Sequence, residues 1–304
     1  MPPRRKAGGP KLAAPWKWHK SGGLQVLQLE AFRKLPWLVH GFSTRIGGVS
    51  QLNGEAVLNL GFMEWDEREK VAANRQRLQE AVGASALTLV PLKQIHSDIV
   101  QVFGVESSGK TKGVRLHTGD APATNCSGLL IGVQTADCVP ILLVDPKKRA
   151  VAAIHAGWPG TLRRITEKTV GRMSLEFKSR PPDLLAAIGP CIGPCCYEVG
   201  ADFVAKFMAQ FADAADYFDE AHTGEEPNPL QWLNMAPPGH QPPPKKVHLD
   251  LRKANRSQLL AVGLRTQNIF TSDLCTGCRR DLFFSYRKEG TQTGRQISVI
   301  GVRP

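Results

Sequence analysis

The sequence predicts an α/β fold, with mixed β-sheets flanked by helices in a single domain. Two observations carry this prediction. Short apolar runs, of the length usual for buried strands, alternate along the chain with longer segments of helical periodicity. The chain also has 304 residues, of which 42% are hydrophobic and 22% charged, as in an ordinary globular protein.

The predicted strands are short runs rich in Val, Ile and Leu, bounded by residues that favour turns. They cover residues 24–29, 39–44, 99–103, 128–133, 141–144, 151–155, 184–189, 269–271 and 296–302. The predicted helices cover residues 66–82, 161–176, 200–212 and 250–261. In the first of these, Val71, Leu78 and Val82 recur at helical spacing, and Asp66 and Glu67 suit the positive end of the helix dipole.

Two segments are expected to lie outside this regular structure. Residues 1–22 contain Pro-Pro, Gly-Gly and Ala-Ala pairs and many cations, which is typical of a disordered basic tail. Residues 213–246 are rich in proline, which is unsuited to the interior of a helix or sheet, and are expected to form an excursion on the surface. The catalytic domain is therefore placed at residues 23–304.

The net charge of +12 invites a nucleic-acid interpretation. However, half of this excess comes from six Lys and Arg residues in the first twenty positions, which contain no acidic residue. A basic binding protein without enzymatic activity is thus disfavoured, and contacts with nucleic acid are expected to be limited to weak ones through the tail. The remaining positive charge suits substrates that include phosphate.

A cytoplasmic location is expected. No apolar run approaches the roughly 20 residues of a membrane span, and the N-terminus has no apolar region of the signal-peptide kind. The seven cysteines are odd in number and irregularly spaced, which favours a reducing compartment over a disulfide framework. The sequence leaves the oligomeric state open.

Two histidines and one cysteine lie beside predicted strands. Cys138 lies between strands 128–133 and 141–144, His155 ends strand 151–155, and His96 follows an apolar run. Converging in space, they would be three ligands of a zinc ion with an open fourth position, as in catalytic zinc sites. Because they do not form a local zinc motif, the same residues could instead pack or form hydrogen bonds.

A loop after strand 39–44 is the best candidate for an anion site. Ser43 and Arg45 precede the glycine pair Gly47-Gly48, and backbone N–H groups of a glycine-rich loop can approach phosphate closely. Arg45 is therefore assigned to both substrate binding and catalysis. A simple turn with a solvated arginine is the alternative.

Cys275 and Cys278 form a C-x-x-C pair. A redox pair would be expected to open a helix, whereas Phe283 and Phe284 suggest a strand soon afterwards. A second metal site would need a partner pair, for which Cys191 and Cys195 are available. Structural packing is the favoured role, with the redox and metal roles left open.

Several segments resemble, in the same order, those of the YfiH-like, laccase-domain proteins. The resemblance covers about residues 24–302, and a series of motifs in one order is far more specific than any single motif. The matching segments are Gln94–Ser97, Thr135–Pro140, Ala153–Trp158, Ala187–Gly193, Cys196–Gly200, Cys275–Cys278, Phe283–Arg287 and Thr293–Arg295.

The resemblance implies a zinc-dependent purine nucleoside phosphorylase that acts on adenosine, inosine and methylthioadenosine and also deaminates adenosine. It implies that His96, Cys138 and His155 are the zinc ligands. Asn59 and Arg287 match segments of the family and become candidates for substrate binding, with Arg295 beside them. The expected small-molecule partners are purine nucleosides and phosphate.

The chain departs from the family pattern at two places. Pro159 follows Trp158 where the family has an arginine, whose role Arg163 or Arg164 could take. The family's His-x-Gly-Asp is also missing after the Asn59 motif, where Phe62 and Met63 stand instead. Whatever the family's arginine contacts must therefore be served differently here, and no substrate contact is assigned to Phe62 or Met63.

The expected chemistry depends on whether a metal is present. Zinc would lower the pKa of a bound water toward about 7 and supply hydroxide for deamination. Asp137, beside Cys138, is expected to pack or hydrogen-bond rather than shuttle protons. Without a metal, Cys138 and His155 could form a nucleophile and base in a hydrolase or deamidase. A multicopper oxidase would need many more than the eight histidines present.

Overall fold

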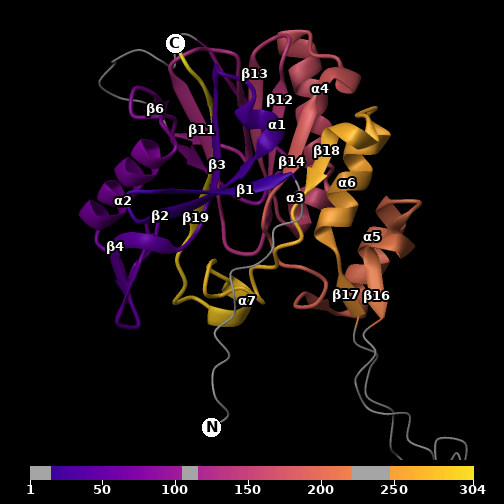
Figure 1. The fold of residues 1–304 in the computed structure, drawn as a ribbon. Helices are drawn as coiled ribbons and strands as arrows, with labels where there is room; N and C mark the ends of the chain where they lie inside the picture. Colours follow the sequence, from indigo (N-terminus) through magenta and orange to yellow (C-terminus); the bar gives the residue numbers. More distant parts are fainter. Residues whose placement is uncertain (1–14, 105–115, 221–246) are drawn as a thin grey trace, which may run out of the picture.

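Two six-stranded β-sheets pack face to face, with helices on the outer face of each (Figure 1). The computed structural model describes residues 15–104, 116–220 and 247–304. The predicted α/β class, with mixed sheets and flanking helices, is confirmed. The strands predicted from apolar runs are all present.

The first sheet is antiparallel except at one edge, where β11 and β6 run parallel. Its long strands carry buried apolar residues on both faces of the sheet, because one face packs against the second sheet and the other packs against a helix. Its strands, in spatial order, are β1 (Trp16–Ser21), β2 (Leu24–Leu29), β3 (Leu38–Ser43), β19 (Gln296–Val302), β11 (Leu129–Thr135) and β6 (Thr88–Leu89).

The second sheet has an antiparallel centre and a parallel pair at each edge. All residues of β12 and β13 are buried, as expected for the central strands of a sheet covered on both faces. Its strands, in spatial order, are β18 (Ile269–Thr271), β14 (Leu185–Ile188), β12 (Val139–Asp145), β13 (Ala150–Ala156), β10 (Ala121–Thr124) and β8 (Val100–Phe103).

The helices complete four layers. The helix α2 covers the first sheet, where Leu78 packs among residues such as Val26. On the opposite side, α4 and α6 cover the second sheet (Figure 1). The helices are α1 (Glu30–Arg33), α2 (Arg68–Ala81), α3 (Trp158–Leu162), α4 (Ile165–Phe177), α5 (Ala201–Gln210), α6 (Leu251–Ala261) and α7 (Tyr286–Glu289), with 3-10 turns at Pro181–Asp183, Ala214–Tyr217 and Thr266–Asn268.

Three small sheets accompany the two large ones. Two are strand pairs, formed by β4 (Ile46–Leu52) with β5 (Glu55–Val57) and by β7 (Leu92–Lys93) with β9 (His117–Thr118). In the third, β17 (Val247–Leu249) lies between β15 (Glu198–Val199) and β16 (Phe218–Glu220). The segment predicted as one helix at 161–176 is divided into α3 and α4. The division falls at Arg164, whose φ of 62° lies in the left-handed region.

The predicted tail and excursion need correction. The tail was expected to extend to Gly22, but Trp16–Ser21 form β1, which pairs with β2 along its whole length. Its pattern was missed because only Trp16 is fully buried and the strand lies at the sheet edge. The predicted excursion begins too early, because β16 ends only at Glu220. Residues 1–14 and 221–246 lie outside the described structure.

A further correction concerns Phe283 and Phe284. They were expected to lie in or near a strand, but both belong to a buried turn that leads to α7. Backbone bonds from the N–H groups of Leu282 and Phe283 to the carbonyl of Arg279 close this turn. Its apolar residues are buried under the first sheet rather than paired within it.

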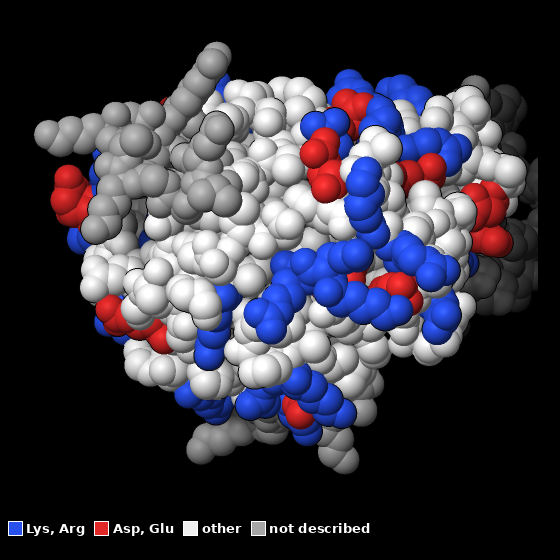
Figure 2. All heavy atoms as spheres, turned by 90° about the horizontal axis from the view of Figure 1, so that it is seen from above, with Lys and Arg blue, Asp and Glu red and all other residues white. Residues whose placement is uncertain are grey.

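Basic side chains gather in a band on one end of the molecule, with acidic side chains among them (Figure 2). That view looks down on the upper end of Figure 1, whereas α7 lies at the lower end. In the described ranges, no helix combines the length and apolarity needed to cross a membrane.

Candidate functional site

His96, Cys138 and His155 converge at one place. Their donor atoms all lie within 4.8 Å of one another. The Sγ atom of Cys138 is 3.9 Å from Nε2 of His96, and the rings of His96 and His155 meet edge to face with centroids 4.7 Å apart. The predicted convergence of these three residues is therefore present in the structure.

The second sheet positions two of the three residues. His155 lies within β13 and pairs in register with Pro140 of β12. Cys138 immediately precedes β12, so the two side chains are neighbours across one strand pair. His96 comes from the loop after β7 and has a φ of 57°, a conformation that costs energy for a residue other than glycine and must be held by its surroundings.

Asp120 holds this arrangement together. Its carboxylate accepts a hydrogen bond from Nδ1 of His155 at 2.8 Å. It also accepts the backbone N–H groups of Ile95, His96 and Ser97 at 3.2, 3.0 and 2.7 Å, and the hydroxyl of Ser97 at 2.6 Å. One buried carboxylate thus fixes the loop that carries His96 and turns Nε2 of His155 toward the site.

The charges of these groups depend on one another. Burial opposes ionisation of the Cys138 thiol, but His155 and His96 outweigh it and lower its pKa to about 6. Burial likewise opposes the charge on His155, yet Cys138 and Asp120 together raise its pKa to about 9. Despite burial, hydrogen bonds from His155 and Ser97 lower the pKa of Asp120 to about 2. The site is therefore built for a thiolate beside imidazoles.

A glycine allows the three donors to come so close. A Cβ atom at Gly157 would stand 3.0 Å from Sγ of Cys138 and 3.0 Å from Cδ2 of His96. These distances are tighter than ordinary van der Waals contact. A side chain at this position would therefore crowd Cys138 and His96, two of the three donors.

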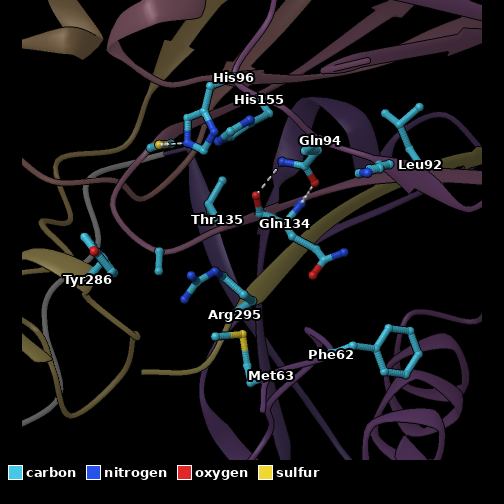
Figure 3. Close-up of a pocket in the computed structure, with 13 residues that line it drawn as sticks. Phe62, Met63, Leu92, Gln94, His96, Gln134, Thr135, His155, Tyr286 and Arg295 are labelled. Carbon is cyan, nitrogen blue, oxygen red and sulfur yellow. Dashed lines mark hydrogen bonds between the residues drawn. The ribbon is translucent and has the colours of Figure 1, made fainter. Parts of the chain in front are cut away.

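A cavity of about 600 Å³ opens beside the three donors (Figure 3). Both histidines lie at one end of it in that view, with Phe62 and Met63 at the other and Arg295 between them. The lining residues are Phe62, Met63, Leu92, Lys93, Gln94, His96, Gln134, Thr135, Ala136, Cys138, His155, Tyr286 and Arg295. This size is typical of pockets for small organic ligands.

Two sets of hydrogen bonds fix the polar wall of this cavity. Gln94 and Gln134 exchange hydrogen bonds of 2.8 and 2.7 Å between side chain and backbone. Asn59 is fully buried and accepts the backbone N–H of Arg295 at 2.9 Å. Asn59 therefore positions Arg295 and is not itself in the lining. Burial lowers the pKa of Arg295.

Arg45 and Ser43 lie away from the donors. The guanidinium of Arg45 is bound to Glu289 at 2.6 Å and lies over the ring of Phe284, 4.6 Å from its centroid. The hydroxyl of Ser43 accepts the backbone N–H of Ile297 inside the first sheet. Neither residue lines a cavity that contains the three donors. The anion-site prediction for this loop gains no support, because Arg45 is paired with Glu289 in a partly buried ion pair.

A second cavity, of about 270 Å³, adjoins two of the donors, His96 and Cys138, and is lined partly by Arg287, Tyr197 and Trp158. Arg287 donates to the carbonyl of Glu198 at 2.7 Å and lies over the ring of Tyr197, 4.8 Å from its centroid. Trp158 packs edge to face against Phe203.

Asp137 is committed to hydrogen bonds. Its carboxylate accepts the hydroxyl of Thr276 and the backbone N–H of Arg287, each at 2.6 Å. The structure thus shows the hydrogen bonds that were expected of this side chain.

Pro159, directly after Trp158, does not supply the guanidinium that the family's arginine would supply at this position. Pro159 lies in the first turn of α3, where its missing N–H is tolerated. Arg163 donates to the backbone carbonyl of His96 at 3.1 Å, and Arg164 is bound to Glu167. Of the two proposed replacements, only Arg163 contacts the site.

Sequence reasoning missed several residues of the site. Asp120 was missed because its five hydrogen bonds converge from segments that are distant in the sequence. The Gln94–Gln134 pair lay within segments that were noted for other reasons. Phe62 and Met63 were noted only as a departure from a family pattern.

Comparisons with known proteins identify the family to which the chain is similar. Residues 39–303 match the family described as multi-copper polyphenol oxidoreductase laccase. A purine nucleoside phosphorylase of Deinococcus radiodurans is 38% identical over 263 residues, which cover 86% of this chain and 88% of that protein. An adenosine deaminase, RL5, from an unknown prokaryotic organism is 34% identical over 270 residues, covering 86% of this chain and 93% of its own.

A solved structure gives the same result for the fold. The hypothetical protein YfiH of Bacillus licheniformis superposes with a TM-score of 0.77 at 27% identity, covering 96% of this chain and 100% of that one. The resemblance to YfiH-like, laccase-domain proteins is therefore confirmed.

Proposed function

The chain belongs to the multi-copper polyphenol oxidoreductase laccase family, and on this premise we propose that it is a zinc-dependent purine nucleoside phosphorylase that also deaminates adenosine. One observation carries the proposal: His96, Cys138 and His155 line the same cavity as Arg295. Metal-binding donors and a cation for phosphate thus face a space large enough for a nucleoside. The names of the relatives support the same reaction class.

The donor set fits a zinc ion. Two imidazoles and a thiolate are ligands that zinc prefers, and three protein ligands leave a position open, as in catalytic sites. Because Asp120 occupies Nδ1 of His155, the other ring nitrogen of His155 is left for the ion. Zinc bound there would supply a Lewis acid and lower the pKa of water.

A multicopper site fits less well. In the described ranges, only two groups of His, Cys, Asp and Glu side chains have donor atoms close enough to hold a metal, and one consists of cysteines alone. Several copper centres would require further histidine clusters. We therefore assign the His96, Cys138 and His155 group to a single ion.

The remaining lining residues would hold the nucleoside. Phe62 and Tyr286 line the cavity and are 54% and 52% exposed, and aromatic faces stack on purines. The Gln94–Gln134 pair presents a fixed amide edge for hydrogen bonds. Trp158 is less suited to stacking, because its ring already packs against Phe203.

Phosphorolysis requires that negative charge be held near the ribose. A phosphate oxygen forms a bond to C1′ while the bond from C1′ to the base nitrogen breaks, and the base takes up a proton. Arg295 is assigned to hold the phosphate, because its guanidinium lines the main cavity and Asn59 fixes its backbone. Arg287 is assigned to substrate binding in the smaller, adjoining cavity.

Loss of the metal ligands tests this proposal. We expect His96→Ala, Cys138→Ala and His155→Ala each to lower bound zinc and phosphate-dependent base release together, by at least about a hundredfold in kcat/KM, because the three share one ion. Adenosine, inosine and methylthioadenosine would be the substrates, with ammonia release measured alongside. A chelator should inactivate the wild type and added zinc should restore it.

The metal-free alternative makes a different prediction. If Cys138 were a nucleophile with His155 as its base, Cys138→Ala would abolish turnover while His96→Ala would be mild and chelation would have no effect. Cys126→Ala is the matched control, because Cys126 is also a free, partly buried cysteine but lines neither cavity. Full activity in metal-free protein would reject the zinc proposal.

A further inference from the structure

The geometry points to a second metal site, in which Cys195, Cys196, Cys275 and Cys278 bind one zinc ion as a closed, structural centre. These cysteines come from two segments far apart in the sequence, Cys195–Cys196 and Cys275–Cys278, yet their Sγ atoms all lie within 4.8 Å of one another. None of them belongs to the cavities of the first site. The inference does not depend on the proposed reaction.

The spacing of the thiols suits a tetrahedral ion. Sγ of Cys278 lies 3.4 Å from that of Cys195 and 3.5 Å from that of Cys196. Zinc–sulfur bonds of about 2.3 Å place the sulfurs of a tetrahedral site roughly 3.8 Å apart. Small adjustments of the side chains would therefore bring all four into position.

Two short turns present these thiols. In the first, the carbonyl of Gly193 accepts the N–H groups of Cys196 and Tyr197 at 3.0 and 3.1 Å, so that neighbouring cysteines project to one side. In the second, the N–H of Arg279 donates to the carbonyl of Cys275 at 3.0 Å and closes the C-x-x-C turn. Paired ligands on two turns are the usual construction of a structural zinc site.

Glycines allow the two turns to approach. A Cβ atom at Gly277 would stand 3.0 Å from Sγ of Cys196. A Cβ atom at Gly193 would stand 2.9 Å from Arg252 and 3.3 Å from Sγ of Cys195. Each turn thus has a residue without a side chain where it faces the cysteines of the cluster.

The surroundings favour thiolates at the buried end of the cluster. The N–H of Gly193 donates to Sγ of Cys275 at 3.2 Å. A hydrogen bond of this kind favours the thiolate form of the sulfur. Backbone N–H groups that donate to metal-bound sulfur have the same stabilising effect.

A redox role is less consistent with the chemistry of the group. A redox pair would use two thiols, whereas four lie within 4.8 Å of one another, as the ligands of a single ion must. A zinc ion would displace the thiol protons to solvent, with no change in oxidation state. Cys191, which the sequence suggested as a ligand, is instead fully buried in the core beside the cluster.

The cluster also supports the first site. Thr276, inside the C-x-x-C turn, donates to Asp137, the neighbour of Cys138. Tyr197, which follows Cys196, lines the smaller cavity. An ion that joins the two turns would therefore hold one wall of that cavity in place.

Metal content measured by elemental analysis tests this inference. We expect two zinc ions per chain in the wild type, one in the double variant Cys195→Ser/Cys278→Ser and one in His96→Ala/His155→Ala. X-ray absorption on the histidine variant should show zinc surrounded only by sulfur, at about 2.3 Å. If the first site held no zinc, the wild type would contain one ion, lost in the cysteine variant and kept in the histidine variant.

A measurement on the wild type avoids variants that fail to fold. Chelation should increase alkylation of Cys195 and Cys278, which are exposed, and re-addition of zinc should protect them again. Cys126 is the internal control and should react equally in both states. Unchanged zinc content in the cysteine variant, iron in place of zinc, or an unreduced mass showing a Cys195–Cys278 disulfide would each overturn the inference.

Discussion

At the scale of single residues, Asp120 has the largest effect on the candidate site. It is fully buried, and it ties His155 to the loop of His96. A carboxylate is needed because it accepts from five donors without offering one of its own. The geometry of two metal-binding residues thus depends on a third residue that need not touch the ion.

Asp120→Asn tests this role. The amide keeps the shape of the side chain, but its NH₂ group would face donors, so we expect zinc affinity to fall about 10- to 100-fold. Competition with a chromogenic chelator measures the zinc affinity, and kcat/KM at saturating zinc measures the activity that the variant retains. Asp183→Asn is the control, because Asp183 pairs with Lys147 elsewhere on the surface and should leave affinity unchanged.

At the scale of elements, β3 contains a buried histidine that links strands of the first sheet. Nε2 of His40 accepts the backbone N–H of Leu29 at 2.9 Å, and the His40 carbonyl accepts Nε2 of Gln28. Burial, with a smaller effect from Arg33, lowers the pKa of His40 to about 3. His40 is therefore neutral in the folded protein at any moderate pH.

This shift predicts a dependence of stability on pH. The unfolded chain takes up a proton on His40 below a pH of about 6.5 while the folded chain does not, so the free energy of unfolding should fall as pH decreases from there toward about 3. His40→Gln should reduce this slope. Urea unfolding of both proteins, with chelator present throughout, measures the difference; equal slopes would show that His40 is not responsible.

At the scale of the whole molecule, the two sheets share one hydrophobic core. Leu27 and Ile131 of the first sheet pack in the same cluster as Leu142 and Val151 of the second. The edge strand β1 covers part of this core, since Trp16 is 4% exposed and packs edge to face against Phe42. The N-terminal strand is thus part of the fold, even though no site residue lies in it.

Truncation at the N-terminus tests the contribution of β1. Deleting residues 1–22 removes β1 and uncovers apolar surface, and loss of Trp16 alone should cost about 3–5 kcal/mol. We expect a clear fall in melting temperature, with turnover retained by the molecules that remain folded. Deletion of residues 1–14, which keeps β1, is the comparison; equal melting temperatures for the two deletions would contradict the assigned role.

The sequence by itself determined the α/β class, the long strands and the helices, because buried strands and amphipathic helices leave local patterns of apolar residues. It also identified His96, Cys138 and His155, since each follows or ends such a run. The edge strand β1 was missed because most of its residues are only partly buried and leave no apolar run in the sequence.

Only the tertiary structure decided which polar residues meet. Arg45 looked suited to an anion, but a partner more than two hundred positions away, Glu289, neutralises it. Asp120 likewise contacts the site through a partner distant in the chain, His155. Cys196, and not the expected Cys191, lies beside the C-x-x-C pair in the folded chain. Hydrogen bonds and metal ligands are set by distances of a few ångströms between segments, and such distances leave no periodic pattern in the sequence.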